Sequence, residues 1–92
     1  MTPVLESCSY KNLSASALVK TGAGRLLGLI CASSSSGTVK IWDNTSAATT
    51  VLLNTMSLTA GTFYPVPGAF STGLYVTIGG TADITVFFAP DS

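Results

Sequence analysis

The sequence predicts an all-β protein, a single antiparallel β-sandwich or small jelly roll of seven to eight short strands. Apolar and polar residues alternate in short runs, which is typical of strands with one buried face. Clusters of Gly, Ser, Pro and Asn separate these runs at a spacing of about ten residues. No segment has the i, i+3, i+4, i+7 apolar stripe of an amphipathic helix.

The regular pattern contains seven expected strands. They cover residues 14–19, 25–33, 38–43, 50–56, 63–67, 74–78 and 84–88. The first is short and flanked by polar residues, which favours a strand over a helix. The second is mostly apolar, so we expect it to be buried on both faces. The fifth contains Pro65 and Pro67, which cannot donate to a central ladder, and we expect it at a sheet edge or a bend.

Glycine-rich and polar segments between these strands are predicted as turns and loops. They are residues 21–24, 33–37, 43–46, 59–62, 68–73 and 79–83. Of these, 33–37 and 79–83 are expected to be hairpin loops. Alternation along the strands places a set of apolar side chains in the core: Val39, Ile41, Leu74, Val76, Ile78, Ile84, Val86 and Phe88.

A chain of 92 residues forms one domain with a modest core, and no internal repeat is present. Residues 1–17 precede the regular pattern and are predicted as an N-terminal arm. This arm either packs on its own domain or reaches a neighbouring subunit as an added strand. The β-sandwich domain is then residues 18–92.

Charge is scarce along the whole chain. Four acids and four bases make up 9% of the residues, histidine is absent and the formal net charge is zero; soluble domains typically carry about 25% charged residues. A free monomer needs surface charge to stay dispersed, so we expect much of this surface to be covered by partners. Because no basic cluster occurs, direct nucleic-acid binding is not expected.

The sequence suggests neither a membrane protein nor an exported one. No run reaches the roughly 18 apolar residues that span a bilayer. The N-terminus lacks the basic start and long apolar run of a signal peptide, so synthesis in a cytoplasm is expected. The glycosylation sequons at Asn12 and Asn44 are interpreted as chance matches in a chain rich in Ser, Thr and Asn.

The side-chain inventory argues against an enzyme. Serines are plentiful, but no histidine is present to act as a base. Asp43 and Asp83 both occur in turn contexts, where Asp commonly forms Asx turns, and neither belongs to a calcium-loop pattern. No cofactor, metal site or catalytic residue is therefore expected.

The two cysteines match no metal or redox spacing. Cys8 and Cys31 are interpreted as small, partly buried apolar residues on strands. A disulfide between them stays open as an alternative if the first strand pairs beside the strand with Cys31, although a reducing compartment disfavours it.

Three aromatic residues are the candidate interface. If the inward set above fills the core, alternation turns Trp42, Tyr75 and Phe87 toward the solvent side. Large aromatic side chains in such positions favour a contact with another subunit. Two alternatives remain open: loops or an asymmetric sandwich cover these residues, or they form a ligand platform.

Three segments resemble one family of known proteins. They are GTVKIWDNTS at residues 37–46, AGTFYPVP at 60–67 and FSTGLYVTIGGTADITV at 70–86. Together they resemble small β-sandwich virion proteins encoded among the structural genes of tailed bacteriophages. The resemblance covers roughly residues 18 to 88 and brings no catalytic residues with it.

This resemblance implies a non-enzymatic structural role on the virion. Its members include capsid decoration, or cement, proteins, which are often trimeric, and head-fibre and neck components. We therefore expect a homotrimer that binds the phage major capsid protein in the assembled shell and bridges capsomers, after synthesis in the host bacterial cytoplasm. The alternatives are a head-fibre, neck or tail adaptor component, or a carbohydrate-binding β-sandwich module.

Overall fold

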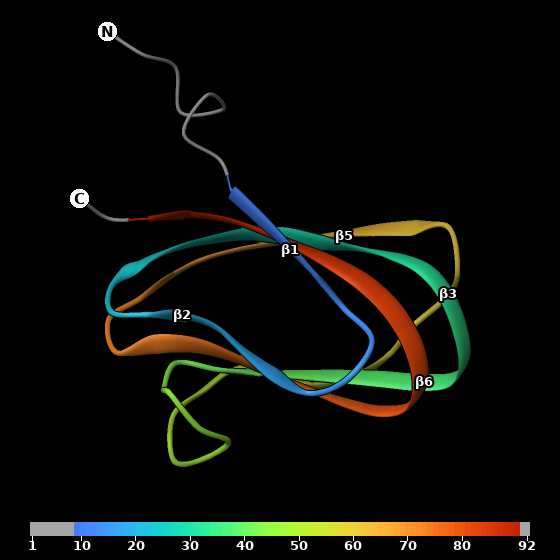
Figure 1. Cartoon of the computed structure of the whole chain (residues 1–92), viewed down its shortest axis with the longest axis horizontal. Helices are drawn as coiled ribbons and strands as arrows, with labels where there is room; N and C mark the ends of the chain where they lie inside the picture. Colours follow the sequence, from blue (N-terminus) through green and yellow to red (C-terminus); the bar gives the residue numbers. More distant parts are fainter. Residues whose placement is uncertain (1–8, 91–92) are drawn as a thin grey trace, which may run out of the picture.

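Residues 9–90 are described by the computed structural model, and they form one antiparallel sheet without a helix (Figure 1). The strands are β1 (Ser9–Leu13), β2 (Ala17–Thr21), β3 (Gly24–Trp42), β4 (Val51–Ser57), β5 (Thr62–Phe70) and β6 (Gly73–Pro90). The predicted all-β, antiparallel class is confirmed. A sandwich or jelly roll is not, because all six strands belong to the same hydrogen-bonded sheet.

Two long strands form the centre of the sheet. β3 has 19 residues and β6 has 18, and they pair from Gly24 opposite Pro90 to Trp42 opposite Tyr75. β1 and β2 flank β6, whereas β4 and β5 flank β3. Figure 1 shows that β3 and β6 curve together at one end of the molecule, so the sheet bends back on itself. We call the two parts the β1/β5 half and the β2/β4 half.

The bend lies where the sequence predicted two hairpin loops. In residues 33–37 and 79–83 the ladder continues, with Ser33 opposite Asp83 and Ser35 opposite Thr81, and its register then shifts. Ser36 and Gly80 have positive φ values of 57° and 68° at this shift. The two predicted loops were therefore wrong: small polar residues here mark a corner within paired strands, and six strands replace the expected seven to eight.

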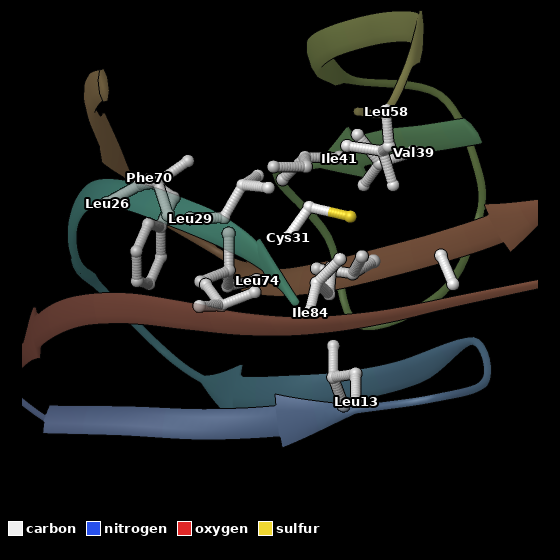
Figure 2. Packing of buried hydrophobic residues seen from close by; sticks show 13 residues of the cluster. Leu13, Leu26, Leu29, Cys31, Val39, Ile41, Leu58, Phe70, Leu74 and Ile84 are labelled. Atoms are coloured by element: carbon white, nitrogen blue, oxygen red, sulfur yellow. The ribbon is translucent and has the colours of Figure 1, made fainter. Parts of the chain in front are cut away.

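One hydrophobic core is shared by both halves of the sheet. Of the eight side chains predicted to point inward, six are fully buried: Val39, Ile41, Leu74, Val76, Ile84 and Val86. The other two, Ile78 and Phe88, are half-buried and pack against this cluster. Figure 2 shows side chains of β3, β5 and β6, including Leu29, Phe70 and Leu74, in the same cluster. The inner faces of the two halves thus enclose a single core.

The strand expected at residues 25–33 is buried on one face only. Leu26, Leu29 and Cys31 are buried, whereas Arg25 and Ile30 are exposed. The register shifts between Leu26 and Gly28, which brings Leu26 and Leu29 to the same side despite their odd spacing. A run of apolar residues in the sequence therefore conceals a bulge and an outer face.

The two edge strands of the β1/β5 half match the sequence predictions in part. β5 pairs with β3 and lies at an edge, as its prolines predicted. However, residues 68–70, predicted as loop, extend β5 as far as Phe70. Within the predicted arm, Ser9–Leu13 pairs with β6 of its own domain, which is the first of the two alternatives. Residues 1–8 lie outside the described part of the chain.

Candidate interaction surfaces

Trp42 and Tyr75 lie side by side on the outer face of the β2/β4 half. They are direct cross-strand partners, and the row continues to Leu18 on β2 and Val51 on β4. Trp42 and Tyr75 are half-buried, whereas Leu18 and Val51 are 37% and 42% exposed. These four residues, which we call the Trp42 row, form an apolar band across four strands.

The polar and aromatic groups of Trp42 are already engaged within this half. Its Nε1 donates to Thr77 Oγ1 at 2.7 Å, and that hydroxyl donates to the Lys40 carbonyl oxygen at 3.1 Å. The Lys40 Nζ atom lies 4.4 Å from the centroid of the Trp42 ring, which is a cation–π contact. A sugar ring that stacked on this side of Trp42 would have to displace Lys40, which weighs against a ligand platform there.

Phe87 lies in the other half of the sheet, away from Trp42 and Tyr75. Its cross-strand neighbours are Tyr10 on β1 and Gly28 on β3. The Phe87 ring is 6.4 Å from the Phe63 ring, centroid to centroid, and tilted by 55°. Tyr10 is 72% exposed, Phe63 50%, and Ile30, which pairs with Phe63, 37%. Tyr10, Ile30, Phe63 and Phe87 form an apolar surface, which we call the Phe87 face.

The two surfaces point in opposite directions. Leu74 and Val86, which precede Tyr75 and Phe87 in the sequence, are fully buried in the shared core. Alternation therefore turns Tyr75 and Phe87 outward from their respective halves. The three predicted interface residues thus do not form one patch, but belong to two faces separated by the core.

Glycine at position 28 makes room for the Phe87 face. A Cβ atom at Gly28 would lie 2.9 Å from the Phe63 ring and 2.6 Å from the Tyr64 carbonyl oxygen. Sequence reasoning missed Phe63, although inward Tyr64 and Val66 would have turned it outward by alternation. It also missed Tyr10, because residues 1–17 were interpreted as an arm rather than as part of the sheet.

Asp43 connects the end of β3 to the turn between β5 and β6. Its Oδ1 accepts from the backbone N–H of Thr72 at 2.9 Å, of Ser71 at 3.0 Å and of Gly73 at 3.4 Å. Partial burial raises the pKa of Asp43, but these N–H donors and the Ser71 hydroxyl outweigh it, so the pKa is lowered overall. The carboxylate acts as a long-range clamp.

The local side-chain hydrogen bonds of the turn after β3 are formed by Asn44, not by Asp43. Asn44 Oδ1 accepts from the Thr45 N–H at 2.7 Å, and Asn44 Nδ2 donates to the Ala48 carbonyl oxygen at 3.1 Å. Asp43 does begin the turn after β3, whereas Asp83 is not in a turn and lies within β6 opposite Ser33. The Asx-turn interpretation was therefore wrong for both aspartates.

Asp83 is held by the first sequon asparagine. Asn12 Nδ2 lies 2.7 Å from Asp83 Oδ1, 3.0 Å from the Ile84 carbonyl oxygen and 3.2 Å from Thr85 Oγ1, and donates within this group. The amide nitrogens of both sequon asparagines, Asn12 and Asn44, are thus engaged in hydrogen bonds.

Cys31 is a free, fully buried thiol whose Sγ lies 3.3 Å from the Ser33 carbonyl oxygen, to which it donates. β6 lies between β1 and the strand that contains Cys31. The neighbouring arrangement on which a disulfide depended is therefore not formed, and Cys8 lies outside the described residues.

Among residues 9–90, no three His, Cys, Asp or Glu side chains come together in a way that could hold a metal ion. Within the same range, no helix is long and apolar enough to cross a membrane. Comparison of the chain with protein-family models, with curated proteins and with solved structures gives no match.

Proposed function

We propose that this chain is a non-enzymatic structural protein of a tailed-phage virion, of the capsid cement type. The observation that supports it best is the pair of apolar surfaces, the Trp42 row and the Phe87 face, on opposite sides of the core that the bent sheet encloses. A protein that bridges neighbours needs at least two contact surfaces, and exposed apolar patches are typical of such surfaces. The resemblance of residues 37–86 to phage virion proteins supports the same role.

The sheet edges favour association through these faces rather than through strand addition. β5 carries two prolines, and the register of β2 and of β4 shifts along its length. On β1, the exposed Lys11 places a charge at the edge. Prolines, bulges and edge lysines all hinder pairing with a further strand.

The proposal includes the partners, location and finer fold. The partners are other copies of the chain, as a homotrimer, and the phage major capsid protein in the assembled shell. The site of action is the capsid surface, after synthesis in the host cytoplasm. The bent sheet would then serve as a small sandwich whose two layers share the long strands β3 and β6.

Light scattering and co-sedimentation test this proposal together. Purified protein at several concentrations is mixed with assembled capsids and, separately, with free coat subunits. We expect saturation of assembled capsids at a fixed stoichiometry and no binding to free subunits. A double Leu18→Ser, Val51→Ser variant of the Trp42 row and a Tyr10→Ser variant of the Phe87 face locate the contact. Protein that stays monomeric and ignores capsids would refute the proposal.

Two alternatives have different readouts. A head-fibre, neck or tail adaptor would use the same apolar surfaces at a lower copy number, so its stoichiometry per particle distinguishes it. A carbohydrate-binding module is favoured by the 72% exposure of Tyr10, since sugar rings stack on such side chains. A glycan array with hits that vanish in Tyr10→Ala would support the module, whereas an empty array removes it.

A further inference from the structure

Two opposite charges lie at the two ends of the Phe87 face. Arg25 pairs with Ala89 at one end, and Asp83 lies on β6 at the corner end. Inward Leu26 and Ile84 neighbour these residues in the sequence, so alternation turns both charged side chains toward the outer side. The apolar residues of the Phe87 face lie between them.

Both charged groups have hydrogen-bonding atoms that a partner could contact. Arg25 is exposed, and its guanidinium group has no hydrogen-bond or ion-pair partner within residues 9–90. Asp83 accepts from Asn12 through Oδ1, whereas its Oδ2 accepts no hydrogen bond in the same part of the chain. Neither group is neutralised by its own fold.

We propose that the Phe87 face binds the Phe87 face of a second copy of this chain about a two-fold axis. An isologous contact places residue i of one copy against residue j of the other, and j against i. With the axis parallel to the sheet and across the strands, the two β6 strands run antiparallel, and Arg25 of each copy meets Asp83 of the other. One face thus supplies both members of two ion pairs.

The register positions of the apolar residues are also related by this two-fold rotation. Tyr10 and Phe87 are paired at one level, and Ile30 and Phe63 are paired at the level of Thr85. A two-fold axis midway between Asp83 and Ala89 exchanges these two levels. Phe87 of each copy then lies over Thr85 of the other and beside its Ile30, while Phe63 lies over Pro65 and Tyr10 over Asn12.

The size of the face indicates a weak dimer. Asp83 and Ala89 are six positions apart along β6, or about 20 Å of strand, and four strands span a similar width. This is about 400 Å² per copy in projection, below the roughly 800 Å² per partner of a standard stable interface. We expect a dimer that dissociates in the micromolar range.

Charge also distinguishes a second copy from other occupants. A uniformly acidic surface would face Asp83, and a uniformly basic one would face Arg25, with repulsion at one end in each case. Single-stranded nucleic acid could stack on the aromatic residues, but its phosphates would be repelled by Asp83. Only a partner with charges of both signs in reverse order satisfies both ends, and a second copy has that order.

Charge reversal in the full chain tests the contact. Arg25→Glu alone and Asp83→Arg alone each create two like-charge contacts, so we expect the dimer dissociation constant to rise about tenfold or more. An equimolar mixture of these two variants restores both ion pairs in a heterodimer, as does the double variant in a homodimer. Lys20→Glu, on β2 in the other half, is the matched control and should leave the dissociation constant unchanged.

Sedimentation velocity measures the masses, and thermal melting checks that each variant is folded. Restored dimer in the mixture and in the double variant establishes the two-fold contact. A monomer at every concentration, or single variants that dimerise like the parent protein, would overturn it, as would binding of an oligonucleotide that Tyr10→Ser abolishes.

The dimer contact goes beyond the proposed capsid role, and either proposal can be refuted without the other. Capsid binding is measured by co-sedimentation, whereas the charge-reversal series uses the protein alone. The Trp42 row stays free for a shell or for a threefold contact. A trimer that also paired through the Phe87 face would appear as a hexamer, and Arg25→Glu would return it to a trimer.

Discussion

Replacing Gly80 by Ala should show how much stability the corner of the sheet contributes. Gly80 has a φ of 68°, in the left-handed region that an L residue enters at a cost of about 1–2 kcal/mol. A Cβ atom at this position would also overlap the Ser36 carbonyl group and lie 3.3 Å from Gly37 Cα. These are backbone atoms of the paired strand, so relief requires movement of the corner itself.

Gly61 provides a matched control for this substitution. Its φ is 80°, but a Cβ atom there would meet nothing within 4 Å. Gly61→Ala should therefore lower the free energy of unfolding only by the cost of an L residue at positive φ, about 1 kcal/mol. The reduced entropy of the unfolded chain partly offsets this loss. Gly80→Ala carries the same cost plus the displacement of packed backbone, and we expect a total loss of about 2–4 kcal/mol.

Urea unfolding followed by the fluorescence of Trp42, the single tryptophan, measures both free energies. A chain of this size has a stability of about 5–14 kcal/mol, so Gly80→Ala should still fold, with a markedly lower midpoint. Equal losses in Gly80→Ala and Gly61→Ala would refute the reasoning, because the corner would then not depend on close backbone contact at this point.

Two further predictions concern buried or clamped side chains. Asp43→Asn should lose about 1–3 kcal/mol at neutral pH, because the clamp on Ser71, Thr72 and Gly73 depends on a carboxylate. Since the folded state lowers the pKa of Asp43, its contribution is present above about pH 4, the unfolded value, and is lost as the pH falls through the folded pKa. Urea unfolding should therefore show that the difference in the free energy of unfolding between the parent protein and Asp43→Asn becomes smaller from neutral to acidic pH. A difference that does not change with pH would contradict the stabilising role of the Asp43 carboxylate. In a Cys8→Ser variant, the fully buried Cys31 thiol should react with a thiol reagent only as fast as the protein opens, and fully in denaturant; fast reaction of the folded protein would show that Cys31 is accessible.

The inward faces of the strands could be predicted because alternation depends only on local sequence. Val39, Ile41, Leu74 and Val76 occur every second residue and are all fully buried. The turns at residues 21–24 and 59–62 were also predicted, because each contains glycine. In the structure, Gly22 and Gly61 have the positive φ values that such turns use. Where the period of two is unbroken, the residue types alone determine which side is buried.

The period breaks at bulges, and there the sequence was misleading. Leu26 and Leu29 both face the core only because the register shifts between Leu26 and Gly28. The outward position of Ile30 follows from the same shift, so part of the Phe87 face could not be derived from alternation. Asp43 was misjudged for another reason: its partners lie about 30 residues away in the sequence, beyond the reach of any local turn motif.

The corner explains why the predicted interface divides into two surfaces. A Ser- and Gly-rich segment has the same composition whether it closes a hairpin or bends two paired strands. In a hairpin, Tyr75 and Phe87 would lie on adjacent strands and could form one patch. In the bent pair they lie on one strand, β6, on either side of the corner, and the fold turns them to opposite sides of the core. The continuity of β3 and β6 through residues 33–37 and 79–83 therefore makes this domain two-sided, and a two-sided domain is what both a bridging role and a face-to-face dimer require.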